Sequence, residues 1–324
     1  MALTNVDLYR IDGTLGSVSN VTTFALNGGQ LAGARNRIIN GSTSVDQRNA
    51  GSVQTFTAGA ALSYSVDRWY GYCTGANVTG QQVVGAVANT YRYQFTGAPA
   101  ATAIGFGQRI EAINCADLAG TTTTLSVDLA NSFLTSVTWT AYYANTTDTF
   151  GTLASPTRTQ IATGSFTVTS TVTRYSAQIS MPAAATTGIE IVFTVGAQTS
   201  GTWTIGNVQL EAGSVATPFE RRSYGQELAL CQRYFFKIRQ SLSISGLTSG
   251  GGPVSYRAHK SFPVSMQSAP TLGLTTWVNT SNMPTGSILD LGTDGFTYIG
   301  TTATVSLAGA TGSYPSGITA DAEL

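Results

Sequence analysis

Histidines and paired carboxylates carry much of enzyme chemistry, and this chain has few side chains that could serve in that way. His259 is the single histidine among 324 residues. A Ser-His-Asp triad needs a partnered histidine base, and a histidine-rich zinc site needs more than one histidine. We therefore expect His259 to be a solvated or hydrogen-bonded strand residue, and we predict no metal and no cofactor. The sequence also lacks the GxxxxGKS/T, GxSxG and GxGxxG patterns.

Carboxylates could still act in pairs. Glycoside hydrolysis uses two carboxyl groups about 5–10 Å apart across a cleft, and the candidates are Asp67, Glu111, Asp117 and Glu190. Simpler roles are open to each of them. The first two would form ion pairs with Arg68 and Arg109, the third would end a turn, and the fourth would lie on the solvated face of a strand. We expect no enzyme, and hydrolysis of a polysaccharide stays the alternative.

Aromatic side chains beside amides could instead bind a sugar. A pyranose ring stacks on Trp or Tyr while amide groups take its hydroxyls. Trp277 lies between two predicted strands, where a loop aromatic is favoured, and Asn279 and Asn282 follow it. With Tyr298 from a later strand, these residues are the predicted receptor-binding site. Three other tryptophans lie in alternating strands and are expected in the core: Trp69, Trp139 and Trp203.

Short alternating stretches predict that strands position these side chains. Period-2 patterns occur at 91–95, 125–129, 137–143, 175–179 and 189–195, separated by Gly, Asn and Thr turns. The alternation slips once, at Gly206-Asn207, which predicts a β-bulge. No repeat of about 20–50 residues is visible, which argues against a β-helix or a propeller. The predicted class is all-β: a jelly-roll β-sandwich, a short helix and a second, distal β-sandwich.

One helix is predicted, at 223–236. Ser223 and Gln226 form a capping box, and an apolar arc contains Leu228, Cys231 and Phe235. A helix of this length is marginal alone, so its apolar side needs a covering surface. We expect these three residues to meet around the threefold axis of a homotrimer, and a single-chain mass in light scattering would contradict this.

The changes in pattern divide the chain into four parts. Residues 1–34 alternate loosely and end in a Gly-rich stretch, which indicates an attachment or trimerisation arm. Residues 35–220 form the jelly roll, 221–236 the connecting helix, and 237–324 the distal β-domain.

Composition narrows the possible partners. Charged residues make up 10% of the chain and the formal net charge is zero, so the sequence offers no basic footprint for nucleic acid and no membrane-surface patch. The N-terminus has no signal-peptide pattern, and no apolar run is long enough for a transmembrane helix. Three cysteines without CxxC spacing, Cys73, Cys115 and Cys231, are expected to be buried and free.

Five motifs in order resemble those of tailed-bacteriophage tail fibre and receptor-binding proteins that carry a carbohydrate-binding-module-like jelly roll. They are Asn36–Gly41, Val66–Tyr70, Gly107–Glu111, Val208–Glu220 and Glu227–Tyr234. The resemblance covers residues 35–235, and it implies a virion tail fibre protein, assembled in the host cytoplasm. Such a protein would recognise a host surface glycan and dock on other virion tail or baseplate proteins through its N-terminal arm. A structural virion protein without receptor binding is the second alternative.

Overall fold

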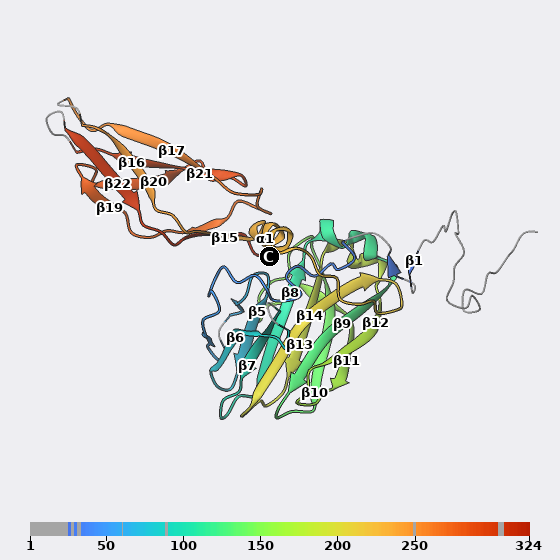
Figure 1. Ribbon diagram of the computed structural model, residues 1–324. Helices are drawn as coiled ribbons and strands as arrows, with labels where there is room; N and C mark the ends of the chain where they lie inside the picture. The colour runs from blue at the N-terminus through green and yellow to red at the C-terminus, as the bar shows by residue number, and fades with distance from the viewer. Residues whose placement is uncertain are drawn as a thin grey trace, which may run out of the picture.

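The computed structural model describes residues 25–26, 29–30, 34–59, 61–87, 90–248, 251–303 and 308–324. Two short strands, β1 (Ala25–Leu26) and β2 (Gly29–Gln30), pair with each other. The rest of the predicted arm, except position 34, lies outside the described residues. The predicted all-β class is confirmed: two six-stranded antiparallel sheets form a sandwich, and one short helix and three small sheets follow (Figure 1).

The first sheet has the strand order β11-β10-β13-β8-β5-β4. Its strands are β4 (Ser63–Tyr64), β5 (Tyr70–Thr74), β8 (Ala103–Ile110), β10 (Ser136–Ala144), β11 (Arg158–Thr167) and β13 (Ile189–Val195). The second sheet has the order β12-β9-β14-β7-β6-β3. Its strands are β3 (Gln54–Phe56), β6 (Val78–Val84), β7 (Tyr91–Thr96), β9 (Thr122–Asn131), β12 (Thr173–Ser180) and β14 (Thr202–Ala212). Three short 3-10 helices close one end: η2 (Ala112–Asn114), η3 (Ala116–Leu118) and η4 (Ala183–Thr187).

Aromatic rings fill the space between these two sheets. Trp69 stacks on Phe106 at 4.7 Å between ring centroids, and Trp203 stacks on Phe95 at 5.3 Å. Trp69 and Trp203 are fully buried, and Trp139 is 6% exposed. The core position predicted for these tryptophans is confirmed, as is the burial of the three free cysteines.

The predicted bulge is also present. The pairing of β14 with β9 shifts register between Gly206 and Gln209, and Asn207 has a φ of 45°. A side chain that can hydrogen-bond locally tolerates this left-handed backbone better than most. Asn207 donates to Asp128 across the sheet at 2.8 Å.

The helix α1 (Tyr224–Gln232) is shorter than predicted. Ser223 caps it and accepts a hydrogen bond from the Gln226 amide at 3.4 Å, so the predicted start is confirmed. The predicted end at 236 is wrong, because Phe235 and Phe236 belong to strand β15 (Phe235–Ile238), which pairs with the C-terminal strand β23 (Ile318–Asp321). Aromatic residues are common in strands, and pairing with β23 decides the conformation of Phe235 and Phe236.

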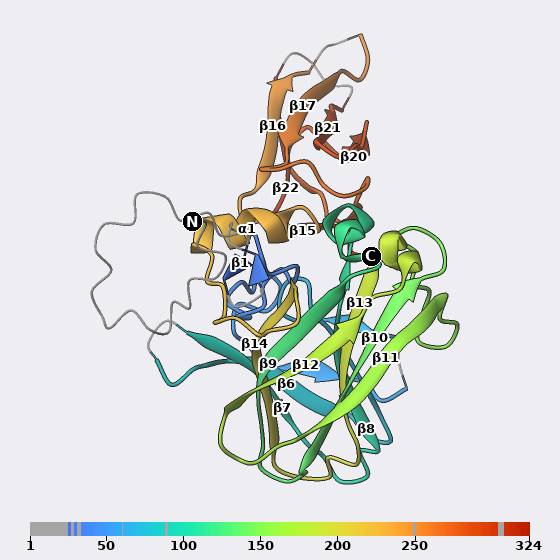
Figure 2. The ribbon, with the colours of Figure 1, turned by 90° about the vertical axis from the view of Figure 1, so that its right-hand side faces the viewer.

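Small sheets make up the distal unit, which projects from the sandwich beyond α1 (Figure 2). One sheet has the order β15-β23-β18, with β18 at Thr271–Gly273, and a second has β16 (Leu242–Leu247), β22 (Gly309–Tyr314) and β19 (Val278–Ser281). The third contains β17 (Ser255–Ser261), β21 (Gly295–Thr301) and β20 (Thr285–Leu289). These strands enclose a core of their own around Phe296, Met283 and Ile318.

Charged side chains tie the distal unit to the sandwich. Arg68, 1% exposed in its side chain, pairs with Glu323, and Arg48 pairs with Glu323 at 3.1 Å and with Asp321 at 2.9 Å. The guanidinium of Arg48 also lies 3.7 Å from the centroid of the Phe235 ring. The end of the described chain therefore packs beside α1, between the two parts of the molecule (Figure 1).

Contacts within the single chain cover most of the apolar arc that was predicted to pack around a threefold axis. Cys231 is fully buried and Phe235 is 3% exposed within the single chain, while Leu228 is half-buried. Ile39, Val45 and Tyr234 pack in the cluster that contains Cys231. The burial of this arc therefore needs no second copy, and the homotrimer stays a prediction.

Candidate functional site

Trp277 lies where the sequence predicts, in the loop before β19, but its ring is packed against the distal unit. Indole Nε1 donates to the Met283 carbonyl at 2.9 Å, and the ring meets Tyr314 edge-on at 4.9 Å. The indole also lies against Gly286 and Gly312, where an added Cβ would stand 2.2 Å and 2.1 Å from it. Trp277 is half-buried, so only part of its ring is open to a ligand.

The other predicted receptor-binding residues are divided between surface and core. Asn279 is exposed and accepts a hydrogen bond from the Met283 amide at 3.0 Å, whereas Asn282 is half-buried and donates to the Gly309 carbonyl at 3.0 Å. Tyr298 is 7% exposed, and its hydroxyl donates to the Ser243 carbonyl at 3.2 Å. The receptor-binding role of the four stays a prediction, and Tyr298 would contribute to it only from beneath the surface.

Glu190 overturns the expectation of a solvated strand position. It faces away from the core, yet it is fully buried beneath its neighbours. Its carboxylate pairs with Arg109 at 2.9 Å and with Arg158, and it accepts a hydrogen bond from the Tyr70 hydroxyl at 2.7 Å. Two guanidinium groups and a hydroxyl satisfy the buried charge.

The partners expected for Asp67 and Glu111 are also wrong. Asp67 is fully buried and accepts hydrogen bonds from the backbone and side chain of Gln47, at 3.1 Å and 2.5 Å. Glu111 pairs with Arg233 at 2.6 Å and accepts from the Tyr234 hydroxyl at 2.7 Å.

Asp117 lies in the first turn of η3 and pairs with Arg37 at 2.5 Å. Each of the four candidate carboxylates thus holds partners from distant parts of the chain.

A tyrosine pair stands over the outer face of the first sheet. Tyr72 on β5 and Tyr142 on β10 point away from the core, and both are half-buried. The Tyr72 ring lies over Gly105 of the neighbouring strand β8, where an added Cβ would stand 2.1 Å from Cζ of the tyrosine. The guanidinium of Arg158 lies 4.2 Å from the centroid of the Tyr142 ring. We call Tyr72, Tyr142 and Arg158 the tyrosine face.

A pocket of about 600 Å³ opens at the tyrosine face. Its lining includes Tyr72, Thr74 and Arg158 together with Ala61 and Leu153, and Tyr142 lies next to it, against the Arg158 guanidinium. Burial raises the pKa of the Tyr72 hydroxyl, against the opposing charge of Arg158, so this hydroxyl stays neutral and able to donate. The Glu190 ion pair holds Arg158 in position from below.

This arrangement has the chemistry of a sugar-binding groove. The Tyr72 ring, the Arg158 guanidinium and nearby threonine hydroxyls match the C–H faces and hydroxyl groups of a saccharide, and the Tyr142 ring supports the guanidinium. None of Tyr72, Tyr142 and Arg158 was predicted as a site residue from the sequence. The available signal was Tyr70 and Tyr72 opposite Gly105 and Gly107, because glycines across a strand pair leave room for flat rings.

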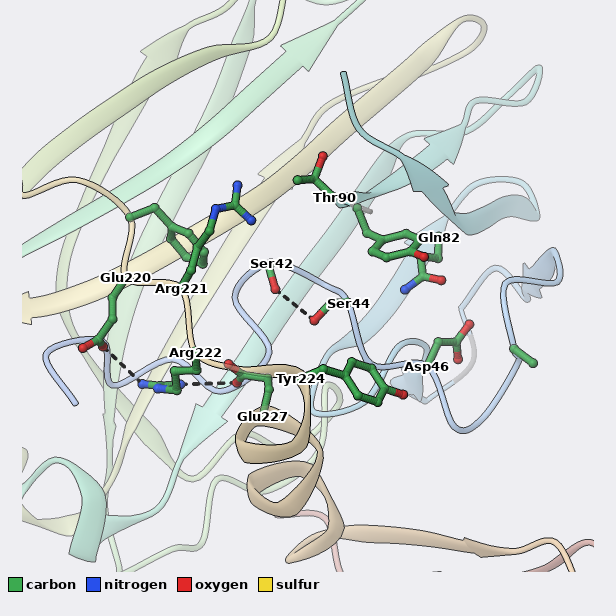
Figure 3. A pocket seen from close by; sticks show the side chains of 13 residues that line it. Ser42, Ser44, Asp46, Gln82, Thr90, Glu220, Arg221, Arg222, Tyr224 and Glu227 are labelled. Atoms are coloured by element: carbon green, nitrogen blue, oxygen red, sulfur yellow. Dashed lines mark hydrogen bonds and ion pairs between the residues drawn. The ribbon is translucent and has the colours of Figure 1, made fainter. Parts of the chain in front are cut away.

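A second pocket, of about 540 Å³, lies where the sandwich meets α1 (Figure 3). Arg222 bridges Glu220 and Glu227 there, at 3.7 Å and 3.3 Å, and donates to backbone carbonyls of the segment that precedes β3. Tyr224 projects toward Ser44 and Asp46 (Figure 3) and is 61% exposed. The Arg222 pairs close one side of this pocket.

Within the described ranges, no group of three or more His, Cys, Asp or Glu side chains is arranged to hold a metal ion. In that same part of the chain, no helix has the length and apolar character needed to cross a membrane.

Comparisons with known proteins give a likeness of fold. No protein-family model and no curated protein matches the sequence. A domain of tailspike protein 4 from bacteriophage CBA120 matches 55% of this chain at 18% identity with a TM-score of 0.33, and this chain spans 21% of that domain. The carbohydrate-binding module TmCBM61, in complex with β-1,4-galactotriose, matches 55% of this chain and 99% of its own at 11% identity, with a TM-score of 0.35.

A putative sugar binding protein from Bacteroides thetaiotaomicron matches over the same shares at 14% identity, also with a TM-score of 0.35. Similarity at these identities and TM-scores concerns the fold alone and does not indicate a ligand or an activity. The sandwich of this chain is similar to carbohydrate-binding modules in fold.

Proposed function

We propose that this protein is a tail fibre subunit of a tailed bacteriophage that binds a bacterial surface polysaccharide without cleaving it. The five sequence motifs over residues 35–235 support the virion assignment, and the tyrosine face supports the ligand class. The low share of charged residues, 10% of the chain, also favours a neutral polysaccharide as ligand. It leaves a surface made mostly of hydroxyl and amide groups.

The observation that carries the proposal is the fixed geometry of the tyrosine face. The Tyr72 ring rests on Gly105, and Arg158 is held between the Tyr142 ring and the buried Glu190. Side chains that are fixed before binding lose little conformational entropy when a ligand arrives. A flat platform with one adjacent charged donor is therefore ready to take a sugar ring.

Tyr142→Ala tests this function in the full chain. We expect it to weaken binding to the polysaccharide that the wild type recognises by about tenfold, because the ring that holds the Arg158 guanidinium in the pocket is removed. The measurement is binding to a microarray of purified bacterial lipopolysaccharides and capsular polysaccharides. Phe133→Ala is the matched control, because Phe133 is an exposed aromatic residue between β9 and β10 and lines neither the pocket at the tyrosine face nor the pocket beside α1.

Two results would contradict the proposal: no binding of the wild type to any array polysaccharide, or equal binding by the wild type and Tyr142→Ala. Thermal unfolding of each variant checks that the sandwich remains folded. A polysaccharide depolymerase would instead release reducing sugar from the bound polysaccharide. A purely structural fibre protein would bind no polysaccharide on the array.

A further inference from the structure

Three arginines gather on the outer face of the second sheet, opposite to the tyrosine face. Arg92 lies on β7, Arg174 on β12, and Arg221 on the segment between β14 and α1. The Phe219 ring lies beside two of them: its centroid is 5.9 Å from the guanidinium carbon of Arg174 and 5.7 Å from that of Arg221. We call Arg92, Arg174 and Arg221 the arginine cluster.

One carboxylate forms ion pairs with residues of this cluster. Asp128 on β9 pairs with Arg92 at 2.7 Å and with Arg174 at 3.0 Å. Arg221 is exposed and forms no ion pair with any other described residue. Three guanidinium groups beside one carboxylate leave a surplus of two positive charges.

The nearest other acid is already engaged. Glu220 accepts a hydrogen bond from the Asn36 amide at 2.9 Å and pairs with Arg222 at 3.7 Å. Figure 3 shows Arg221 turned away from this pair, with no interaction drawn to it. The positive surplus of the arginine cluster is therefore not neutralised from that side.

Arg92 carries an unused donor. Its Nε is buried and has no hydrogen-bond partner among the described residues, and its side chain lies over Gly206, where an added Cβ would stand 2.3 Å from Cδ. Burial lowers the pKa of the Arg92 guanidinium, and the charges of Arg221 and Arg174 act in the same direction against Asp128. An anion at the cluster would relieve this repulsion.

Two pockets include arginines of the cluster. One, of about 300 Å³, contains Arg92 and the side chains of Gln94, Ser132, Thr202 and Thr204. The other is the 540 Å³ pocket that contains Arg221 and Phe219. A saccharide whose charged group reached the arginines could place its neighbouring rings in either pocket.

We propose that the arginine cluster binds the anionic group of an acidic saccharide, a second recognition site on the face opposite to the tyrosine face. Guanidinium groups bind carboxylate, sulfate and phosphate through paired hydrogen bonds. The site rests on the proposed glycan-binding function but uses other residues and another sheet. Arg174 also braces the sheet through Ser126 at 2.6 Å, so Arg221 is the residue free for the ligand.

Affinity electrophoresis of the full chain tests the site, with polygalacturonate, heparin or neutral galactan in the gel at physiological salt. We expect an acidic polymer to retard the wild type. Arg221→Gln should weaken that retardation at least about fivefold, because one charge-assisted contact is lost. Arg257→Gln, which removes an exposed arginine on β17, is the matched control and should behave as the wild type. Polygalacturonate carries carboxylate alone, whereas heparin carries sulfate as well as carboxylate, so retardation by heparin alone would indicate that sulfate is the preferred group.

Equal losses in Arg221→Gln and Arg257→Gln would overturn the proposal, because they would indicate attraction by net charge alone. Absence of retardation by both acidic polymers would overturn it as well. The proposed function is tested by a different variant, Tyr142→Ala at the tyrosine face. Failure of the proposed function and failure of this further site can therefore be told apart.

Discussion

Asp67 is a buried carboxyl group whose pKa is raised to about 7. Burial raises the pKa, and hydrogen bonds from Gln47 lower it only in part. In the unfolded chain the same group has its ordinary value of 3.8. Its contribution to stability is therefore complete below about pH 4 and is lost as the pH rises through 7. The protein carries a carboxyl that favours folding in mild acid.

Asp67→Asn should remove this pH dependence. We expect the free energy of unfolding of the wild type, relative to that of Asp67→Asn, to fall by roughly 3 kcal/mol between pH 5 and pH 8. Urea unfolding at both pH values measures it, with Asp117→Asn as the control for loss of one negative charge. A difference between wild type and Asp67→Asn that is the same at both pH values would contradict the assignment.

The partners of individual charged residues were the least predictable feature. Alternation along β13 places Glu190 away from the core, which is correct. It does not reveal that Arg109, on the neighbouring strand β8, and Arg158, on β11 two strands away, cover the carboxylate. Sequence neighbours such as Asp67 and Arg68 suggested a local pair, whereas the junction between the sandwich and the distal unit brings Glu323 to Arg68. These contacts depend on which segments, far apart in the sequence, pack together in the fold. That information cannot be derived from a single sequence.

At the scale of the strand, β8 controls the tyrosine face through a residue without a side chain. Gly105→Ala would place a methyl group 2.1 Å from the Tyr72 ring and force the ring to move. We expect this variant to weaken polysaccharide binding at least about threefold while every ligand-contacting side chain is retained. Microarray binding measures it.

Gly196→Ala is the matched control, because an added Cβ meets nothing within 4 Å there. If Gly105→Ala bound the polysaccharide as well as the wild type, the position of the Tyr72 ring would not matter for binding. A melting temperature close to that of the wild type ensures that a loss of binding reports on the platform rather than on unfolding.

Elements were predicted better than contacts. Period-2 patterns located β7, β9, β10 and β13, because one face of each strand must be apolar to cover the core. The irregular spacing at Asn207 located the bulge, and Ser223 located the start of α1. The end of α1 was missed, since Phe235 and Phe236 fit a helical arc and a strand equally well until β23 is known to pair with them.

At the scale of the molecule, buried ion pairs join the sandwich to the distal unit. Arg68 and Glu323 are almost fully buried in their side chains, so removing one partner would leave an unpaired buried charge. This junction explains why the helix arc is covered within one chain. The homotrimer thus needs a surface other than Cys231 and Phe235.

Hydrogen exchange of the full chain, with and without a polysaccharide fragment selected on the array, tests the central claim most directly. Backbone amides that a ligand shields exchange more slowly. We predict protection in β5, in β10 and in the 152–158 segment, which together surround the tyrosine face. Protection at 277–282 in the distal unit, with unchanged exchange across the first sheet, would contradict the account.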